Sequence, residues 1–500
     1  MSRTPDTSVA IIGSGFAGLG MAIRLKREGI EDFIVLERAA DLGGTWRDNH
    51  YPGLSCDIPS HVYSFSFELN PDWTRGFAPG WEIQRYLKRT AEKYGILPHL
   101  RYDHEVLDAR WEEDGRRWRI QTTRGDVTAR VLVSAAGGLS EPSIPDLPGL
   151  GRFQGRAFHS ADWDHDHDLD GRSVAVIGTG ASAIQFVPQI QPRLGRLHLF
   201  QRTPPWVVPR LDHEITGLEH EMLRRIPFAP RVVRWALYWL MELRVVLFRR
   251  PRLMRIGDRL ARKHLARQVP DPGLRSKLTP DYVMGCKRVL ISDDYYPALT
   301  QPNVDVVTSG ITEVREASIV DGDGNEREVD TIIFGTGFEV TDLPITHRVR
   351  GGDGRTLAEH WDGSMQAYLG SSIAGFPNLF MLVGPNTGLG HNSIVFMIES
   401  QINYVVDALR TMRRRGIARI EVRPEVQDRF NEELQREMEG TVWTAGRCQS
   451  WYLDDTGRNT TLWPGWTFDF RRRTRRFDPA AYLVTDGAAG RAEAPAAVRS

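Results

Sequence analysis

Two segments of this chain follow the same design, and their first glycines, Gly13 and Gly178, lie 165 residues apart. SVAIIGSGFAGLGMAIRL at 8–25 and SVAVIGTGASAIQFVPQI at 173–190 each join an apolar β-branched run to a glycine-rich turn and a helix-compatible pattern. In such a turn the first glycine permits a tight bend, the second lets the backbone approach a pyrophosphate, and the third allows close contact between helix and strand. The repeat predicts an α/β fold with two doubly wound, Rossmann-like dinucleotide-binding units.

In each unit a second strand follows the glycine turn and its helix, and the residues at the end of that strand differ between the two units. After the motif Gly13, Gly15 and Gly18, the strand 33–36 ends in Glu37, a carboxylate that can accept hydrogen bonds from ribose hydroxyls, as FAD or NAD requires. After the second motif, the strand 197–200 ends in Gln201, Arg202 and Thr203. A guanidinium matches phosphate oxygens, so Arg202 predicts NADPH, although an ordinary surface arginine is the alternative. The second motif comprises Gly178, Thr179, Gly180, Ser182 and Ala183.

Composition narrows the class of protein. The 500 residues carry 64 Lys and Arg against 64 Asp and Glu, so no overall field favours nucleic acid, and we expect no nucleic-acid partner. Only Cys56, Cys286 and Cys448 are present, without a CxxC pair, which argues against a disulfide scaffold, a zinc cluster or a dithiol redox centre. We therefore expect a cytoplasmic protein without a metal site. The alternation of Asp and His in 162–168 offers metal-ligand residue types, but seven consecutive residues rarely build a preorganised site, so we favour a solvated loop.

The order of patterns along the chain predicts a discontinuous organisation. We expect a first nucleotide domain at 1–140 and 330–485, a second at 141–211 and 286–329, a helical insertion at 212–285 and a disordered tail at 486–500. Short strands at 106–111, 117–122 and 126–133 predict a small antiparallel flap, and 392–415 and 423–440 predict long helices. The apolar stretch 228–248 contains Arg231, Arg234, Glu242 and Arg244, so it cannot span a membrane. It either packs between domains or makes weak contact with a membrane surface.

One further segment carries a family resemblance. FQGRAFHSADWD at 153–164 matches the pattern FxGxxxHxxxW(P/D), and the chain thereby resembles the type I Baeyer–Villiger monooxygenases, within the superfamily of flavin-containing monooxygenases. GGTW at 43–46, YPGLSCD at 51–57, FQRTPPW at 200–206 and SWY at 450–452 extend the resemblance over nearly the whole chain. The histidine and tryptophan of the fingerprint, His159 and Trp163, do not by their residue types require catalysis, and we favour a structural role for His159 between domains.

The resemblance implies an FAD- and NADPH-dependent monooxygenase whose substrates are O2 and a small ketone. In that family a C4a-peroxyflavin adds to the ketone, and the tetrahedral Criegee adduct rearranges to an ester or lactone. The developing negative charge requires a permanent cation, which matches Arg288, and the carboxylate that orients this cation matches Asp57. An ion pair of Arg288 with Asp293 or Asp294, and a turn cap at Asp57, are the alternatives.

Cofactor-binding residues also follow from the resemblance. On the FAD side it adds Thr45, Trp46, Asp57, Tyr63 and the backbone of Val106, although Trp46 and Tyr63 also suit a core. On the NADPH side it adds Lys287, beside Arg202 and Thr203, and Trp451. The alternative functions are a flavin-containing monooxygenase that oxygenates amine nitrogen or thioether sulfur, and a non-catalytic nucleotide-binding protein. Neither the ketone nor the oligomeric state follows from the sequence.

Overall fold

The computed structural model describes residues 5–446, 448 and 450–486, and its first sheet contains the first glycine motif. The strand order is β17-β4-β5-β6-β1-β2-β3, with β18 also paired to β6. β1, β2, β3 and β18 extend the sheet in parallel, whereas β4, β5 and β6 form an antiparallel meander. The bounds are β1 Thr7–Ile12, β2 Phe33–Leu36, β3 Leu100–Arg101, β4 Val106–Glu112, β5 Arg117–Thr122, β6 Gly125–Ser134, β17 Val349–Arg350 and β18 Leu379–Met381.

The predicted flap is not a separate element. Its three strands occur where the sequence predicted them, but β6 continues to Ser134 and pairs in parallel with β1 along Thr7–Ile12. The last four residues of β6 are buried, because this part of the strand lies inside the sheet. The meander is therefore an extension of the nucleotide-binding sheet.

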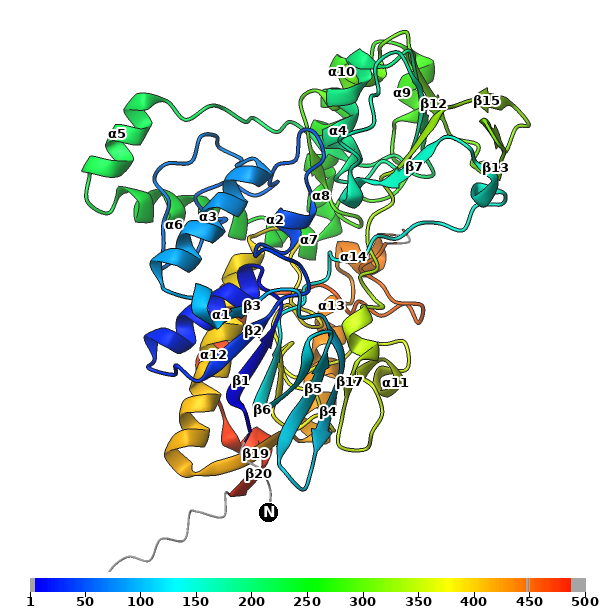
Figure 1. The fold of residues 1–500 in the computed structure, drawn as a ribbon. Helices are drawn as coiled ribbons and strands as arrows, with labels where there is room; N and C mark the ends of the chain where they lie inside the picture. The colour runs from blue at the N-terminus through cyan, green and yellow to red at the C-terminus, as the bar shows by residue number, and fades with distance from the viewer. Residues whose placement is uncertain (1–4, 447, 449, 487–500) are drawn as a thin grey trace, which may run out of the picture.

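The second sheet contains the second glycine motif and is parallel throughout, in the order β12-β9-β8-β16-β7. Its strands are β7 Arg156–His159, β8 Ser173–Ile177, β9 Arg196–Phe200, β12 Val304–Val307 and β16 Thr331–Phe334. The apolar β-branched runs of β8 and β16 are buried, as central strands of a parallel sheet require. The two sheets confirm the α/β class, and Figure 1 shows them as separate layers, the first below and the second at the upper right.

The strand β16 belongs to the second sheet, whereas the expected domain boundary places it in the first unit. A boundary at residue 330 assigns Thr331–Phe334 to the first unit, yet this strand pairs with β8 and β7 of the second sheet. The run TIIF has the same apolar character as strands of either sheet, so composition gives no signal for the choice. The chain returns towards the first sheet after Gly335 rather than before Thr331.

Helices cover the sheets and form the insertion. The first sheet packs against α1 Phe16–Arg27 and the long α12 Ile394–Arg415, which contact each other. The second sheet is covered by α4 Ala183–Ile190 and α10 Tyr295–Leu299. The predicted insertion contains α5 Gly217–Arg225, α6 Ala229–Glu242, α7 Val245–Arg249, α8 Pro251–Gln268 and α9 Pro272–Lys277. The remaining helices are α2 Thr45–Asp48, α3 Gly80–Lys93, α11 Leu357–Trp361, α13 Pro424–Met438, α14 Val442–Ala445 and α15 Thr467–Arg473.

Smaller strand groups complete the structure. β10 Val207–Val208 pairs with β11 Leu290–Ile291, and β19 Ile417–Val422 pairs with β20 Tyr482–Asp486. β13 Ile311–Val314, β14 Ser318–Asp321 and β15 Glu326–Glu328 form an antiparallel sheet beside the second unit. Nearly all of the tail predicted to be disordered, 487–500, lies outside the described residues. Within the described chain, every helix is too short or too polar to cross a membrane.

Candidate active site

The first glycine turn connects β1 to α1, and Gly13 and Gly18 are the positions where a side chain would clash. Gly13 has φ +96°, and a Cβ there would lie 2.7 Å from the carbonyl oxygen of Ala135. A Cβ on Gly18 would lie 1.8 Å from the oxygen of Gly13, so helix and strand approach as closely as the motif predicts. A Cβ on Gly15 would meet the Cα of Gly44 at 3.7 Å. This glycine-lined turn at the start of α1 fits the pyrophosphate of FAD.

Glu37 lies directly after β2 and its side chain is buried. Oε2 accepts hydrogen bonds from the backbone N–H of Ser14 at 3.0 Å and from its hydroxyl at 2.6 Å. Oε1 accepts from the backbone of Ala39 at 3.0 Å and pairs with Arg47 at 2.9 Å. A carboxylate has about four acceptor positions. A ribose hydroxyl that binds Glu37 must therefore displace one of these partners, and the rotatable hydroxyl of Ser14 is the least constrained.

The aromatic residues expected near the flavin form one cluster. Thr45 begins α2, and the indole N–H of the adjacent Trp46 donates to the hydroxyl of Tyr63 at 3.2 Å. The ring of Tyr63 packs edge-on against Phe16, the first residue of α1, with centroids 5.2 Å apart. These contacts place Trp46 and Tyr63 beside the first glycine turn. Val106, by contrast, begins β4, and its backbone oxygen accepts from Arg348 at 2.8 Å.

The second glycine turn connects β8 to α4. Gly178 has φ +106°, and a Cβ there would lie 2.4 Å from the oxygen of Gly335. The hydroxyl of Thr179 donates to the carbonyl of Thr203 at 3.2 Å, which joins this turn to the end of β9. Ala183 begins α4 and is fully buried, so an alanine serves in place of the third glycine. Gly180 and Ser182, the N-cap residue of α4, complete the turn, and a Cβ on Gly180 would have open space apart from one contact at 3.8 Å.

Two cations lie beside this second turn. The side chain of Arg202 is exposed and has no carboxylate at ion-pair distance among the described residues. Burial lowers the pKa of Lys287, and the nearby charge of Arg202 lowers it further. The Lys287 ammonium also lies 5.2 Å from the ring centre of Tyr282. Two neighbouring cations repel each other until an anion binds between them, so this pair fits the 2′-phosphate of NADPH.

Arg288 and Asp57 form an ion pair, as the sequence predicted. Nη2 and Nε of Arg288 lie 2.6 Å and 2.8 Å from Oδ2 of Asp57. The Asp57 carboxylate raises the pKa of Arg288 further above its ordinary value, so the guanidinium stays charged. The alternative partners are engaged elsewhere, since Asp293 accepts from the backbone of Arg210 and Leu211, and Asp294 accepts from Ser292.

The ion pair lies between the two nucleotide-binding units. The segment 51–57 packs on α4, where the Tyr51 hydroxyl donates to Gln185 at 2.9 Å and the Gln185 amide donates to the Ser55 carbonyl at 2.9 Å. On the other side, burial raises the pKa of Tyr63, and the charges of Asp57 and Arg288 act on the same hydroxyl. The permanent cation therefore lies near the aromatic cluster of the first turn, and the segment that carries its partner Asp57 packs on the helix of the second.

Tyr452 is a site residue that the sequence analysis did not select. Its side chain is buried, burial raises its pKa to about 12, and the charge of Arg288 opposes that rise. Arg288 acts on this hydroxyl both through its charge and as a hydrogen-bonding neighbour. The neighbouring Trp451, expected to contact NADPH, is 43% exposed and packs against the Tyr452 ring with centroids 4.4 Å apart. Tyr452 is the tyrosine of SWY at 450–452, and its place in that motif was the available signal.

A disulfide joins Cys286 to Cys448, although the cysteine pattern argued against a disulfide scaffold. The cysteine count and the absence of CxxC gave no reason to pair two residues 162 positions apart. The bond connects the segment that carries Lys287 and Arg288 to the loop that carries Trp451 and Tyr452. Cys56 stays a buried free cysteine.

The fingerprint residues have structural surroundings. Trp163 is buried and packs against Phe158 and Phe186, with ring centroids 5.3 Å and 5.2 Å away. His159 is also buried, its Nδ1 accepts from Ala161 at 3.1 Å, and burial lowers its pKa. In the loop 162–168, Asp164 pairs with Arg156 at 2.6 Å. The interpretation of His159 as a structural residue agrees with these contacts.

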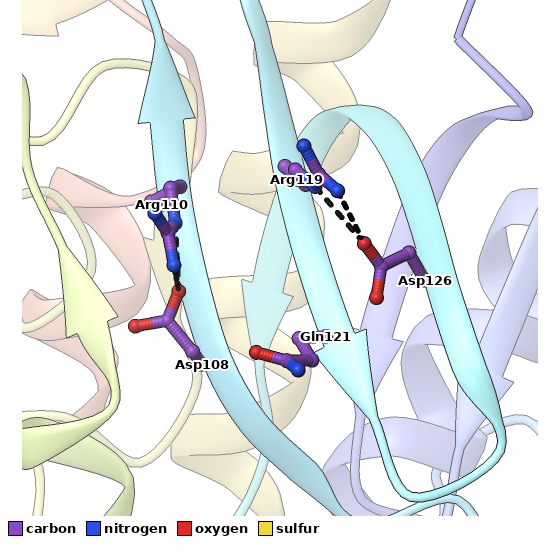
Figure 2. Close-up of a pocket in the computed structure, with 5 residues that line it drawn as sticks. All are labelled: Asp108, Arg110, Arg119, Gln121 and Asp126. Atoms are coloured by element: carbon purple, nitrogen blue, oxygen red, sulfur yellow. Dashed lines mark hydrogen bonds and ion pairs between the residues drawn. The ribbon is translucent and has the colours of Figure 1, made fainter.

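A separate hollow of about 200 Å³ lies on the meander of the first sheet, lined by Asp108, Arg110, Arg119, Gln121 and Asp126. Figure 2 shows that its charges are paired with each other: Arg110 lies 2.9 Å from Asp108, and Arg119 lies 2.7 Å from Asp126. Neither glycine turn nor Arg288 contributes to it. The hollow is therefore not the candidate active site.

Comparison with known proteins agrees with this geometry. Residues 6–347 match the family described as flavin-binding monooxygenase-like. A protein of Streptomyces coelicolor named Baeyer-Villiger monooxygenase is 54% identical over 98% of this chain and 95% of its own length. A protein of the same name from Pseudomonas aeruginosa is also 54% identical, over 95% of this chain and 91% of its own. The crystal structure of OTEMO in complex with FAD and NADP superposes with a TM-score of 0.87 at 26% identity, covering 97% of this chain and all of that one.

Proposed function

The chain belongs to the flavin-binding monooxygenase-like family and is a Baeyer–Villiger monooxygenase that uses FAD and NADPH, and we propose that Arg288 and Asp57 form its reaction centre. The observation that carries this proposal is the 2.6 Å ion pair between the two side chains, whose charges act on the Tyr63 hydroxyl beside the first glycine turn. Bound FAD supplies the electron transfer and the activation of O2. The protein supplies orientation and charge.

The role of Arg288 follows from its permanent charge. Oxygen insertion next to a ketone carbonyl places negative charge on oxygen atoms, and a preorganised cation stabilises that charge without reorganisation. An arginine donates in a fixed plane and does not lose its proton at working pH. Asp57 binds Nη2 and Nε, which fixes the plane of the guanidinium. Asp57 is thus a positioning residue for Arg288.

Cofactor binding divides between the two turns. We propose that Gly13, Gly15, Gly18, Glu37, Thr45, Trp46, Tyr63 and Val106 hold FAD, with Asp57 beside its reactive end. Gly178, Thr179, Gly180, Ser182, Ala183, Arg202, Thr203, Lys287 and Trp451 hold NADPH. The neighbouring cations Arg202 and Lys287, for which the described residues show no ion pair, support a 2′-phosphate at the second turn.

The substrate class is a small ketone, with O2 as co-substrate. We propose the cytoplasm as the compartment, because NADPH is regenerated there.

The test is a panel of cyclic, linear and aryl ketones with one thioether, measured with FAD-loaded enzyme and NADPH. Ester or lactone formed in proportion to NADPH oxidised supports the function. Oxidation of the thioether alone, with every ketone left unchanged, would instead favour the heteroatom-oxygenating class.

A further inference from the structure

The helical insertion exposes an unusual concentration of large apolar side chains. Among the described residues, more than half of the large apolar side chains that are exposed lie between 211 and 260. They are Leu211, Leu218, Met222, Ile226, Phe228, Val232, Trp235, Leu240, Leu243, Leu253, Ile256 and Leu260. Phe228 is 66% exposed and Trp235 64%. Exposed apolar surface of this extent marks an interaction site.

Helix α6 is oriented with its polar side chains towards the protein. Arg234, Tyr238 and Glu242, spaced by four, form one stripe along the helix. Nη1 of Arg234 donates to three backbone carbonyls in the segment 61–64, the closest at 2.9 Å. The Tyr238 hydroxyl and the Thr467 hydroxyl share a hydrogen bond of 2.9 Å. These contacts fix the rotation of the helix about its axis.

Glu242, at the end of this stripe, is fully buried. It accepts hydrogen bonds from the amide of Asn392 at 2.6 Å and from the hydroxyl of Thr467 at 2.8 Å, and His391 lies 3.5 Å away. Burial alone would raise the pKa of Glu242, but His391 and these hydrogen bonds outweigh it and lower the pKa. The carboxylate therefore stays charged and cannot leave the interior without large cost.

One set of apolar side chains in α6 and at its C-terminal end consequently faces outward, whereas Met241 is buried. Val232, Trp235, Leu240 and Leu243 recur at helical spacing and are exposed, whereas a surface helix ordinarily turns its apolar stripe to the core. The preceding α5 adds Leu218 and Met222, and Figure 1 shows α5 at the outer edge of the molecule. The exposure results from a fixed orientation and not from loose packing.

The same region is strongly basic in a chain with no net charge. In α5, Arg224 pairs with Asp72 and Arg225 with Glu221. Residues 231–263 contain the exposed basic side chains Arg231, Arg244, Arg249, Arg250, Arg252, Arg255, Arg259, Arg262 and Lys263. The acids there are Glu242, which is buried, and Asp258, which lies 3.5 Å from Arg262. In α8, Leu253, Ile256 and Leu260 alternate with Arg252, Arg255 and Arg259, none of which has a carboxylate at ion-pair distance in the described part of the chain.

We propose that this insertion face, the outward side chains of α5 and α6 with the arginines of α7 and α8, docks on the surface of an anionic lipid bilayer. A helix of 14 residues is about 21 Å long, too short to cross the roughly 30 Å hydrocarbon layer but suited to lie in its surface. Trp and Leu side chains enter the boundary between headgroups and acyl chains, and arginines bind the lipid phosphates. A second copy of the chain is disfavoured, because two basic faces would repel each other. The inference goes beyond the catalytic function and does not rest on it.

The test is flotation of the full-length FAD-loaded protein with vesicles. One set contains phosphatidylcholine with phosphatidylglycerol, and the other contains phosphatidylcholine alone. We expect the protein to float with the anionic vesicles, and we expect binding to weaken as salt rises. The variant Trp235→Ser/Leu240→Gln should bind at least tenfold less well, with FAD content and ketone turnover unchanged. The control Leu107→Gln makes the same replacement of an exposed leucine by glutamine, but on β4, outside the insertion face. It should bind vesicles like the wild type.

A second measurement requires no variant. Hydrogen–deuterium exchange of the wild type should slow in peptides from 217–243 when anionic vesicles are added. Equal binding by the wild type and the α6 variant, or no change in exchange, would overturn the proposal. A wild-type dimer in light scattering that the α6 variant converts to monomer, without vesicle binding, would assign the face to a second copy and would also overturn it.

Discussion

The guanidinium of Arg288 lies 2.6 Å from the carboxylate of Asp57, although 231 positions separate the two residues in the chain. Asp57 belongs to a segment that packs on α4, and Arg288 precedes β11, so the pair forms only when both nucleotide-binding units are assembled. An acid next to a flavin opposes negative charge there unless it is neutralised. The contact neutralises the carboxylate and gives the arginine one defined orientation.

Replacing Arg288 tests this arrangement directly. Arg288→Ala should retain FAD and its reduction by NADPH, while ester yield falls at least 100-fold and the electrons appear as hydrogen peroxide. Product analysis measures the ester yield, and a peroxide assay on the same samples measures the electrons that are lost to hydrogen peroxide. Arg288→Lys should recover only part of the yield, because an ammonium cannot bind Asp57 in the same plane. An unchanged ester yield in Arg288→Ala would remove Arg288 from the reaction centre.

The exposed cation Arg202 should determine the preference between nicotinamide cofactors. Arg202→Ala should raise KM for NADPH by roughly 10- to 150-fold, which corresponds to the loss of about 1.5–3 kcal/mol from a charge-assisted hydrogen bond, and should leave KM for NADH nearly unchanged. Steady-state kinetics with both cofactors measure the ratio. Arg193→Ala, at an exposed arginine that pairs with Asp170, is the control. Equal losses with NADPH and NADH would contradict a role in binding the 2′-phosphate.

Most residues of the candidate site could be predicted from local sequence patterns. Glycines with positive φ, the acid after β2 and the arginine after β9 each depend on neighbours within one strand, turn and helix, so a single segment predicts them. The pairing of Arg288 with Asp57 required the family resemblance, because no periodicity connects them. Tyr452 was not predicted as a site residue, because aromatic residues are as common in a hydrophobic core as in a binding site.

Contacts over long separations caused the errors. The strand β16 was assigned to the first unit but pairs with β8 of the second sheet. Its sequence TIIF suits a buried strand of either sheet, so local composition could not decide between them. The disulfide of Cys286 with Cys448 depends on a loop reaching back to the second unit, which cysteine spacing does not encode. The outward position of the exposed apolar side chains of α6 could not be predicted from the sequence either. It depends on hydrogen bonds from Asn392 and Thr467 to the buried Glu242, far away in the chain.

The disulfide gives a prediction about the loop that carries Trp451 and Tyr452. Thiol titration of the denatured protein without reductant should detect Cys56 alone, and titration with reductant should detect all three cysteines. Cys448→Ser should lower the free energy of unfolding by about 2–4 kcal/mol, since the bond closes a long loop. Cys56→Ser serves as the control for loss of a thiol. Three reactive thiols in the absence of reductant would contradict the bond.

Acid should weaken the packing of α6 through His61. Burial, with a contribution from the charge of Arg234, lowers the pKa of His61 to about 4, whereas an unfolded histidine titrates near its ordinary value of about 6.5. The unfolded state therefore binds the proton first, and stability falls as pH drops from about 6.5 to about 4. Urea unfolding at several pH values should show less than about 1.4 kcal/mol lost per pH unit from this group. His61→Gln should reduce the slope relative to the wild type, and identical slopes would exclude His61.

Gly18 should tolerate no side chain, because a Cβ there would lie 1.8 Å from the backbone oxygen of Gly13. Gly18→Ala must push α1 away from β1, which moves the N–H groups at the start of the helix away from the position that a pyrophosphate needs. We expect purified Gly18→Ala to contain little FAD, as measured by the ratio of flavin to protein absorbance, and to unfold at a lower temperature. The control is Gly29→Ala, just beyond α1, where a Cβ meets nothing within 4 Å and only the positive φ of +70° opposes the change. Full flavin content in Gly18→Ala would show that close packing at this turn is not required for FAD binding.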